Sequence, residues 1–281
     1  MFSFFSEILQ KKHIDCFAPI PLEDCRIVRP YLLQRCGISS GTAVILAIPY
    51  FTEACLAKDR NISAYAVSRD YHLFFKDLFA TLLPLLRDRF PENRFEGFAD
   101  HSPIAERDAA ARAGLGVIGR NHLLLTERYS SYVFLGEIIT DAIFPCKTQE
   151  ISECENCGAC MRACPAERCG GCYSAITQKK GSLTDHEVRM LLEHEIAWGC
   201  DLCQELCPHT RRAIQNGTIF SPIPFFHEQT LPHLTTEILD SMNDEVFGVR
   251  AYSWRGRDTI ARNLRLLEAS KKRKENTTCS T

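Results

Sequence analysis

The spacing of the cysteines constrains this chain more than any other feature. Residues 154–165 follow the pattern C-x2-C-x2-C-x3-C-P, and residues 200–208 follow C-x2-C-x3-C-P. Thiolates at these spacings hold iron–sulfur clusters, and in two-cluster proteins the fourth cysteine of the first run binds the other cluster. The sequence therefore predicts two [4Fe-4S] clusters. The predicted ligands of one are Cys154, Cys157, Cys160 and Cys207, and those of the other are Cys164, Cys200, Cys203 and one further cysteine.

A zinc site is the main alternative for so many cysteines. Structural four-cysteine zinc sites usually present two separated C-x2-C pairs. Here three cysteines recur at steps of three, and a fourth precedes a proline. The spacing therefore favours iron–sulfur clusters, but it names no reaction, because clusters only move electrons.

Length and composition narrow the class of protein. The 281 residues, 45% of them hydrophobic, are enough for one large domain or two smaller ones, and a net charge of −2 demands no nucleic-acid partner. Residues 1–10 lack the features of a signal peptide, and no uncharged apolar run of about 18 residues predicts a membrane helix. We therefore expect a cytoplasmic protein with reduced thiols. The cysteines outside the predicted clusters are expected to be small buried residues without a role: Cys16, Cys25, Cys36, Cys55, Cys146 and Cys279.

Hydrophobic periodicity predicts a mixture of helices and strands. In the first half we expect short helices in 1–40 broken at three prolines, a buried central strand at 42–48, a long amphipathic helix at 71–90, a short strand running into a turn at 95–103, and a helix at 104–113. In the second half we expect strands at 122–126 and 132–140 (the latter also compatible with a helix), a linker at 142–152, helices at 184–198, 235–247 and 257–269, and a disordered tail at 271–274. Thr184 and Glu187 predict a capping box at the first of these helices.

Two further sequence features have an ordinary and a functional interpretation. Residues 114–121 contain a G-x-G-x-x-G pattern, but it follows a predicted helix rather than a strand, so a tight turn is favoured over a dinucleotide site. The C-terminal region is locally basic, which fits a solvated helix face or a nucleic-acid contact. Its arginines are Arg250, Arg255, Arg257, Arg262 and Arg265.

Several stretches, in order along the chain, carry a resemblance to a known family. They are residues 98–107, 113–121, 134–137, the first cysteine run, 172–174 and 199–204, with 65–72 and 257–264 similar as well. Together they resemble the epoxyqueuosine reductase family, which comprises cobalamin-dependent iron–sulfur enzymes related to reductive dehalogenases. The resemblance covers roughly residues 40–268.

The resemblance assigns roles that spacing leaves open. Both Cys169 and Cys172 lie between the cysteine runs, and the resemblance implies that Cys172 is the eighth cluster ligand and Cys169 a spare thiol. It implies that Asp100, otherwise a turn or N-cap residue, donates a proton above the cobalt. It also implies that three positions contact cobalamin, largely through backbone, where the residues alone indicate a strand core and a close-packing site: Leu125, Gly136 and Ile176.

The implied function is the reduction of epoxyqueuosine to queuosine in tRNA. Electrons would pass from an external low-potential donor through the two clusters to cobalamin, and Asp100 would protonate the epoxide oxygen as it leaves. The expected fold is α+β. It would comprise an α/β cobalamin-binding domain at 1–148, a ferredoxin-like two-cluster module at 149–215, and a short helical, basic segment at 216–281.

The chain also departs from the family pattern. It lacks the C-terminal helical-repeat extension that many members carry, and residues 208–210 read Pro-His-Thr where an aromatic Pro-Trp is common. A tRNA contact would therefore fall to the basic C-terminal segment. Two alternatives remain: a related cobalamin and iron–sulfur reductase with another substrate, and an electron carrier of the ferredoxin type.

Overall fold

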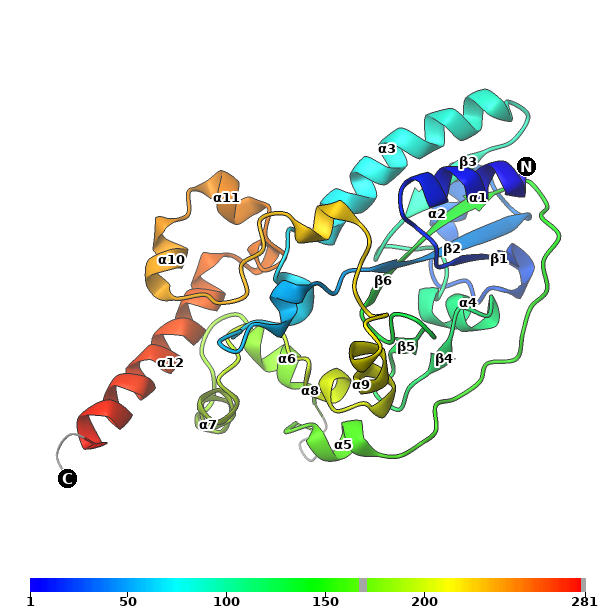
Figure 1. The fold of residues 1–281 in the computed structure, drawn as a ribbon. Helices are drawn as coiled ribbons and strands as arrows, with labels where there is room; N and C mark the ends of the chain where they lie inside the picture. The colour runs from blue at the N-terminus through cyan, green and yellow to red at the C-terminus, as the bar shows by residue number, and fades with distance from the viewer. Residues whose placement is uncertain (167–170, 279–281) are drawn as a thin grey trace. The chain divides into compact units, whose positions relative to one another are not determined.

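The chain forms two compact units, each built from segments that are distant in sequence (Figure 1). This computed structural model describes residues 1–166 and 171–278, with side chains as far as residue 274, so that Cys169 and Cys279 lie outside the described residues. The first unit, here called the sheet unit, comprises Met1–Phe51, Tyr71–Cys157 and Pro208–Pro224. The second, here called the helical unit, comprises Thr52–Asp70, Gly158–Cys207 and Phe225–Thr281. The fold is thus a mixture of α and β structure, as predicted.

The sheet unit is centred on an antiparallel sheet with the strand order β1-β2-β6-β3. The predicted central strand is confirmed as β2 (Thr42–Pro49), and all eight of its residues are buried. The ambiguous stretch at 132–140 is a strand, β6 (Val133–Thr140), which pairs with β2 along its whole length. β3 (Phe95–Phe98) pairs with the other edge of β6, as a strand in the predicted place.

The outer strand β1 (Phe17–Pro21) was not predicted. Its region was expected to be helical, and the α-helices there are α1 (Phe2–Lys11) and α2 (Pro30–Cys36), with a single 3-10 turn at Leu22–Asp24. Pro19 and Pro21 argued against a strand in the sequence, because proline cannot donate a hydrogen bond to a neighbouring strand. At the edge of a sheet, two prolines two residues apart can both turn their nitrogen atoms outward at no cost.

Two helices cover opposite faces of this sheet. On one face, Ala109, Ala110 and Ala111 of α4 (Glu106–Arg112) pack against Ile45 and Ile139. On the other lies α3 (Tyr71–Arg89), the predicted long helix, with Pro84 inside it. Side chains alternate between faces along a strand, so residues 137 and 139 of β6 face α4, whereas residue 136 faces α3.

Two glycines let α3 lie directly on the sheet. A Cβ atom at Gly136 would lie 2.4 Å from the Phe75 ring, and one at Gly97 would lie 2.6 Å from the Phe79 ring. Phe75 and Phe79 are one helical turn apart, so each ring fills the space that one glycine leaves. Gly136 is therefore a close-packing position.

The helical unit is built from short helices and one long one. Its helices are α5 (Ala159–Ala163), α6 (Tyr173–Thr177), α7 (Asp185–His194), α8 (Leu202–Glu205), α10 (Thr236–Ser241), α11 (Asp244–Gly248) and α12 (Arg257–Thr278). The predicted capping box of Thr184 and Glu187 is confirmed at α7. In the part of the chain that has been described, no helix combines the length and the apolar character needed to cross a bilayer.

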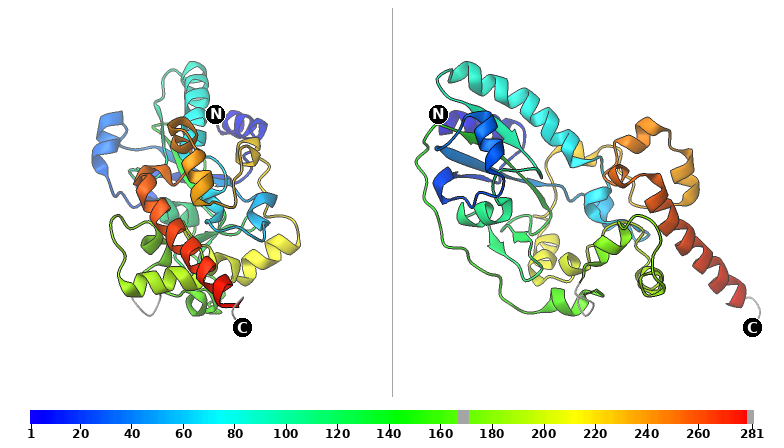
Figure 2. Two further views of the ribbon diagram at one scale, coloured as in Figure 1. Left: turned by 90° about the vertical axis from the view of Figure 1, so that its left-hand side faces the viewer. Right: turned by 180° about the vertical axis from the view of Figure 1, so that it is seen from behind.

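Three helix predictions for this unit need correction. α7 ends earlier than expected, because Glu195 adopts a left-handed conformation with φ 54°. The single helix expected at 235–247 is two helices, separated where Met242 is extended. The tail at 271–274 is helical rather than disordered, since α12 continues as one helix to Thr278 (Figure 2), and Lys274 contacts Glu195 at 3.1 Å.

Candidate functional site

Asp100 lies on a sharply turned loop directly after β3. Its backbone has φ 63°, a left-handed conformation that is uncommon for residues other than glycine. Its side chain is 71% exposed, and the Nε2 atom of His72 on α3 lies 3.7 Å from one carboxylate oxygen. The loop therefore presents the Asp100 carboxylate outward from the sheet unit.

The buried carboxyl group of Glu137 holds the Asp100 loop in place through Ser102. Ser102 Oγ donates a hydrogen bond to Glu137 Oε1 and accepts one from the Ile104 amide at 3.0 Å. Ser102 is 1% exposed and Glu137 is fully buried on β6, on the face that α4 covers. The other oxygen, Glu137 Oε2, has no hydrogen-bond partner among the described residues. Burial and the nearby charge of Glu106 raise the pKa of Glu137 well above its usual range.

Glu106 connects this buried group to Asp100. At the start of α4, Glu106 Oε1 accepts a hydrogen bond from the Asp100 amide at 3.2 Å. Burial raises the pKa of the half-buried Glu106 to about 7, and the negative charge of Asp100 adds to the shift, while Arg29 and Arg107 act against it. Glu106 is therefore poised to gain or lose a proton near neutral pH.

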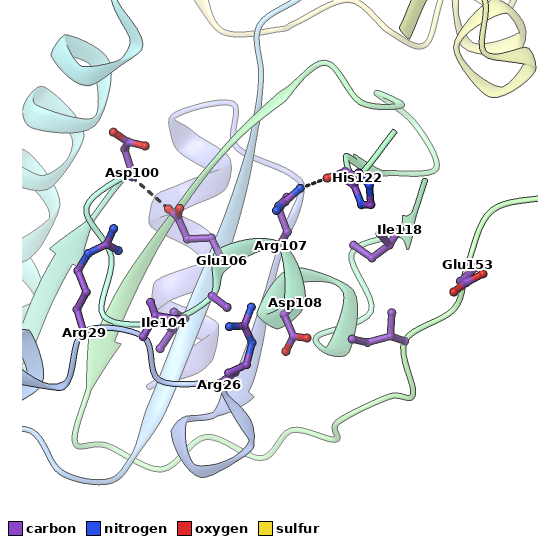
Figure 3. A pocket seen from close by; sticks show the side chains of 13 residues that line it. Arg26, Arg29, Asp100, Ile104, Glu106, Arg107, Asp108, Ile118, His122 and Glu153 are labelled. Atoms are coloured by element: carbon purple, nitrogen blue, oxygen red, sulfur yellow. Dashed lines mark hydrogen bonds between the residues drawn. The ribbon is translucent and has the colours of Figure 1, made fainter. Parts of the chain in front are cut away.

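Asp100 and Glu106 line one pocket of the sheet unit, with a volume of about 670 Å³ (Figure 3). Arg29 and Arg107 line it as well, and Arg107 donates a hydrogen bond to the carbonyl oxygen of His122. These carboxyl and guanidinium groups around an open space can bind a polar ligand, and a proton can pass between Asp100 and Glu106.

The glycine-rich segment at 114–121 is more than the tight turn that was predicted. It contains β4 (Val117–Ile118), which pairs with β5 (Leu124–Leu125), and a Cβ atom at Gly116 would lie 2.3 Å from the carbonyl oxygen of Leu125. The Ile118 carbonyl accepts a hydrogen bond from the Cys154 amide at 3.1 Å. This segment therefore positions the first cysteine of the predicted cluster runs.

The eight predicted cluster ligands are divided between the two units. Cys154 and Cys157 lie in the sheet unit, and the other six lie in the helical unit. No disulfide bond joins any of the thirteen described cysteines. Within residues 1–166 and 171–278, no three His, Cys, Asp or Glu side chains come close enough together to hold a metal ion. The two ligand sets therefore remain predictions.

Some of these thiols lie near one another in the helical unit. α5, which carries Cys160, packs against α8, which carries Cys203. Burial raises the pKa of Cys200 to about 12, and the charges of Cys203 and Cys172 contribute to the shift. Three of the four predicted ligands of the second cluster are thus within electrostatic reach of one another.

Asp201, between two predicted cluster ligands, has a structural role that the sequence analysis missed. Its carboxylate is 4% exposed and accepts hydrogen bonds from Ser63 Oγ at 2.6 Å, the Ala64 amide at 2.6 Å and Arg60 at 2.7 Å. These bonds fix the backbone between Cys200 and Cys203. The sequence offered one signal for this role: an acidic residue between two predicted thiolate ligands needs hydrogen-bond or charge partners when it is buried.

The cysteines without an expected role are buried to different degrees. Cys25 and Cys55 are buried, as predicted, whereas Cys16, Cys36 and Cys146 are half-buried. Burial raises the pKa of Cys16 and of Cys25 to about 12. These two thiols therefore stay protonated and unreactive near neutral pH.

The predicted cobalamin contacts lie in different environments. Leu125 is a buried residue of β5, and the space above Gly136 is filled by Phe75. Ile176 lies half-buried on α6 in the helical unit. Leu125 and Gly136 thus also fit the structural roles that their residue types alone indicate.

Most of the C-terminal arginines bind backbone carbonyl groups. Arg250 donates to Gln229, Arg257 donates to Leu239 and Met242 at the end of α10, and Arg262 donates to Lys179 at 2.7 Å. These three arginines hold segments of the helical unit together. Arg265 is exposed, and the Arg255 guanidinium lies 3.9 Å from the centre of the Trp254 ring, whose residue is 58% exposed.

Known proteins similar to this chain include several epoxyqueuosine reductases. An epoxyqueuosine reductase of Cyclobacterium marinum is 32% identical over 222 residues, which is 73% of this chain and 68% of that protein. Those of Bacillus anthracis and Listeria monocytogenes are 33% and 34% identical, over 83% and 73% of this chain. This chain spans only 64% and 56% of the length of those two relatives. No family model matches the sequence.

Solved structures share the fold. An epoxyqueuosine reductase from Streptococcus thermophilus matches 96% of this chain and 81% of its own with a TM-score of 0.76 and 21% identity. A second, of an epoxyqueuosine reductase with a tRNA-Tyr epoxyqueuosine-modified tRNA stem loop, matches 96% of this chain and 82% of its own with a TM-score of 0.71 and 23% identity.

Proposed function

The chain belongs to the epoxyqueuosine reductase family, and from this premise we propose that it reduces epoxyqueuosine to queuosine in tRNA. The observation that carries the proposal is the Asp100 loop. The Asp100 carboxylate is exposed, and its backbone is held in an uncommon conformation. Ser102, two residues further along the loop, is hydrogen-bonded to the buried Glu137. An uncommon backbone conformation that supporting contacts hold around one exposed acid fits a proton donor better than a turn residue.

The cysteines support the proposed iron–sulfur clusters. Soft thiolates are the ligands that such clusters require, and none of the eight proposed ligands forms a disulfide bond. We assign cluster binding to the module at 149–215, with Cys154, Cys157, Cys160 and Cys207 around one cluster. Cys164, Cys172, Cys200 and Cys203 would surround the other, and the mutual influence of the last three supports this set.

Cobalamin is the second proposed cofactor, held mainly by the domain at 1–148. At the start of β6, the half-buried Phe134 lies on the same face of the sheet as Gly136 and stacks against Tyr71 and Tyr50, with ring centres 4.1 and 4.2 Å away. This apolar surface beside Gly136 fits a large flat ring system. When bound, cobalamin would supply the reducing chemistry at carbon, with electrons arriving through the clusters from a low-potential donor.

The protein's own contribution centres on Asp100. An epoxide oxygen leaves carbon far more readily once it is protonated, and a positioned carboxylic acid can supply that proton. Ser102 and Glu106 hold the loop so that the carboxyl group keeps its place during the reaction. The reaction would take place in the cytoplasm, where thiols stay reduced.

The contact with tRNA is proposed for the helical, basic segment at 216–281. Arg255, Arg265, Lys271 and Lys272 can face an anionic backbone, whereas the other three arginines are engaged within the unit. Trp254 adds an exposed aromatic surface on which a base could stack.

A nucleoside assay tests the function directly. The reconstituted protein should convert tRNA that contains epoxyqueuosine into tRNA that contains queuosine when a strong reductant is supplied. Asp100→Asn should lower the rate by about 10²- to 10⁴-fold while the clusters and the corrin stay bound. Failure of the unaltered protein to form queuosine would contradict the proposal and would favour a reductase of another substrate. Failure to retain any corrin would favour an electron carrier.

A further inference from the structure

The proposed reaction needs more protons than Asp100 can hold. Reduction of an epoxide to an alkene takes up two electrons and two protons and releases one water molecule. A single carboxyl group can give only one proton at a time. A second proton must reach the same oxygen atom before it can leave as water.

Glu106 is placed to supply this second proton. Among the described residues, it is the carboxyl group that accepts a hydrogen bond from the Asp100 amide. Its Oε1 atom lies 3.2 Å from the Asp100 amide nitrogen, and both carboxyl groups line the same pocket (Figure 3). On the basis of the proposed function, we propose that Glu106 supplies the second proton by re-protonating Asp100 during each turnover.

The steps balance as follows. Asp100 gives its proton to the epoxide oxygen as the first carbon–oxygen bond breaks. Glu106 passes its proton to the Asp100 carboxylate through water in the pocket, and Asp100 gives it to the same oxygen as the second bond breaks and water leaves. The two electrons from the low-potential donor form the carbon–carbon double bond. Glu106 regains its proton from solvent, because the pocket opens to the surface.

Burial explains how Glu106 keeps a proton near neutral pH, because it raises the pKa of Glu106 to about 7. Glu137 is fully buried beneath α4, and one of its oxygens has no hydrogen-bond partner among the described residues. Burial and the charge of Glu106 raise the pKa of Glu137 well above its usual range, so these two carboxyl groups do not both ionise near neutral pH.

Other charged groups near the pair modify this balance without removing it. Arg29 and Arg107 favour the ionised form of Glu106, and Asp100 disfavours it. The Cys25 thiol lies near Glu137 and is itself kept neutral by burial. The remaining ionisable groups of the pocket are Arg26, Asp108, His122 and Glu153.

The Glu106→Gln variant tests whether Glu106 acts through its acidic proton or only through its hydrogen bond to the Asp100 amide. Glutamine keeps an oxygen acceptor for the Asp100 amide, so the loop stays in place, but it carries no acidic proton. Because Glu106 holds its proton below pH 7 and loses it above, the rate of the unaltered protein should fall as the pH rises through about 7. The variant should turn over about 10- to 100-fold more slowly and should lack this fall. Glu96→Gln is the matched control, because Glu96 pairs with Arg87 outside the pocket.

A second measurement needs no cofactor. The infrared carbonyl band of a protonated carboxyl group should titrate with a midpoint near pH 7 in the cofactor-free protein and should be missing in Glu106→Gln. A protein that forms no queuosine contradicts the proposed function. A protein that forms it, with a Glu106→Gln variant whose rate and pH profile are unchanged or whose titrating band persists, contradicts the proton supply alone.

Discussion

The two units reach their folded state by different means. In the sheet unit, all eight residues of β2 are buried, and apolar side chains from both faces of the sheet meet helices. In the helical unit, the cysteine-bearing helices have almost no such core: α5 has no buried residue, and the only buried residue of α8 is Gln204. Polar groups such as Asp201 take the place of apolar packing there.

The two units therefore depend on different sources of stability: apolar burial in the sheet unit, and bound clusters in the cysteine-bearing part of the helical unit. A closed apolar sheet is stable through burial alone. Short helices around half-buried thiols gain their stability when the thiols share a ligand, since ligand binding adds directly to folding free energy. The sheet unit should therefore tolerate loss of the clusters far better than the cysteine-bearing helices do.

The largest effect is expected from Cys203→Ser. Loss of one proposed ligand should abolish one cluster, leaving roughly half of the bound iron, and should increase amide hydrogen exchange in α5 and α8. Exchange in β2 and β6 should not change, because their hydrogen bonds lie within the sheet. Cys55→Ser is the control, since Cys55 is a buried thiol with no proposed ligand role. Equal iron content in both variants would contradict the ligand assignment.

Asp201→Asn should have the next largest effect. The variant leaves the Arg60 side chain, which is 11% exposed, paired with Glu205 but beside a neutral amide at position 201, and loss of one buried charge-assisted contact costs up to about 3 kcal/mol. Hydrogen exchange should quicken at residues 60–64 and 199–207, and the nearby cluster should be lost at lower denaturant. Asp240→Asn, at an exposed position of α10, should change neither. Matching exchange rates in the two variants would show that the polar network is unimportant.

Gly136→Ala tests close packing in the sheet unit. The new methyl group would meet the Phe75 ring at 2.4 Å, so the free energy of unfolding should fall by about 1–3 kcal/mol. The comparison is Gly248→Ala in α11, where a Cβ atom meets nothing within 4 Å. Denaturant unfolding of both variants provides the measurement, and an equal, small change in the two would refute the packing argument.

The smallest effect is expected from Thr184→Ala at the start of α7. Loss of the capping box should lower stability by about 1 kcal/mol, and Thr184→Ser, which keeps the hydroxyl group, should restore most of it. Thermal unfolding in the presence of bound clusters measures both. Serine and alanine variants that behave alike would show that the cap contributes nothing here.

The sequence predicted the sheet unit well where local pattern decides the structure. The apolar run of β2 and the helical spacing of α3 identify these elements without further information. β1 was missed because its two prolines are acceptable only at a sheet edge, and no local signal says which strand will be an edge.

The candidate site was less predictable, because its contacts join distant residues. Ser102 meets Glu137 across 35 positions, and Ser63 meets Asp201 across 138. Asp100 came from the family resemblance, whereas Glu106 and Glu137 could not be singled out until the fold placed them beside it. A buried glutamate in an otherwise apolar strand is the one local signal that was available.

The interleaving of the two units has a consequence for synthesis on the ribosome. The sheet unit is completed by Pro208–Pro224, where Ser221 binds the carbonyl groups of Phe51 and Pro49. This segment leaves the ribosome only after the cysteines at 158–207. At about 5–20 residues per second, residues 1–51 wait on the order of ten seconds for it. The thiols at 158–207 emerge before that interval ends, so chaperones and iron delivery meet them on a chain whose first unit is still open.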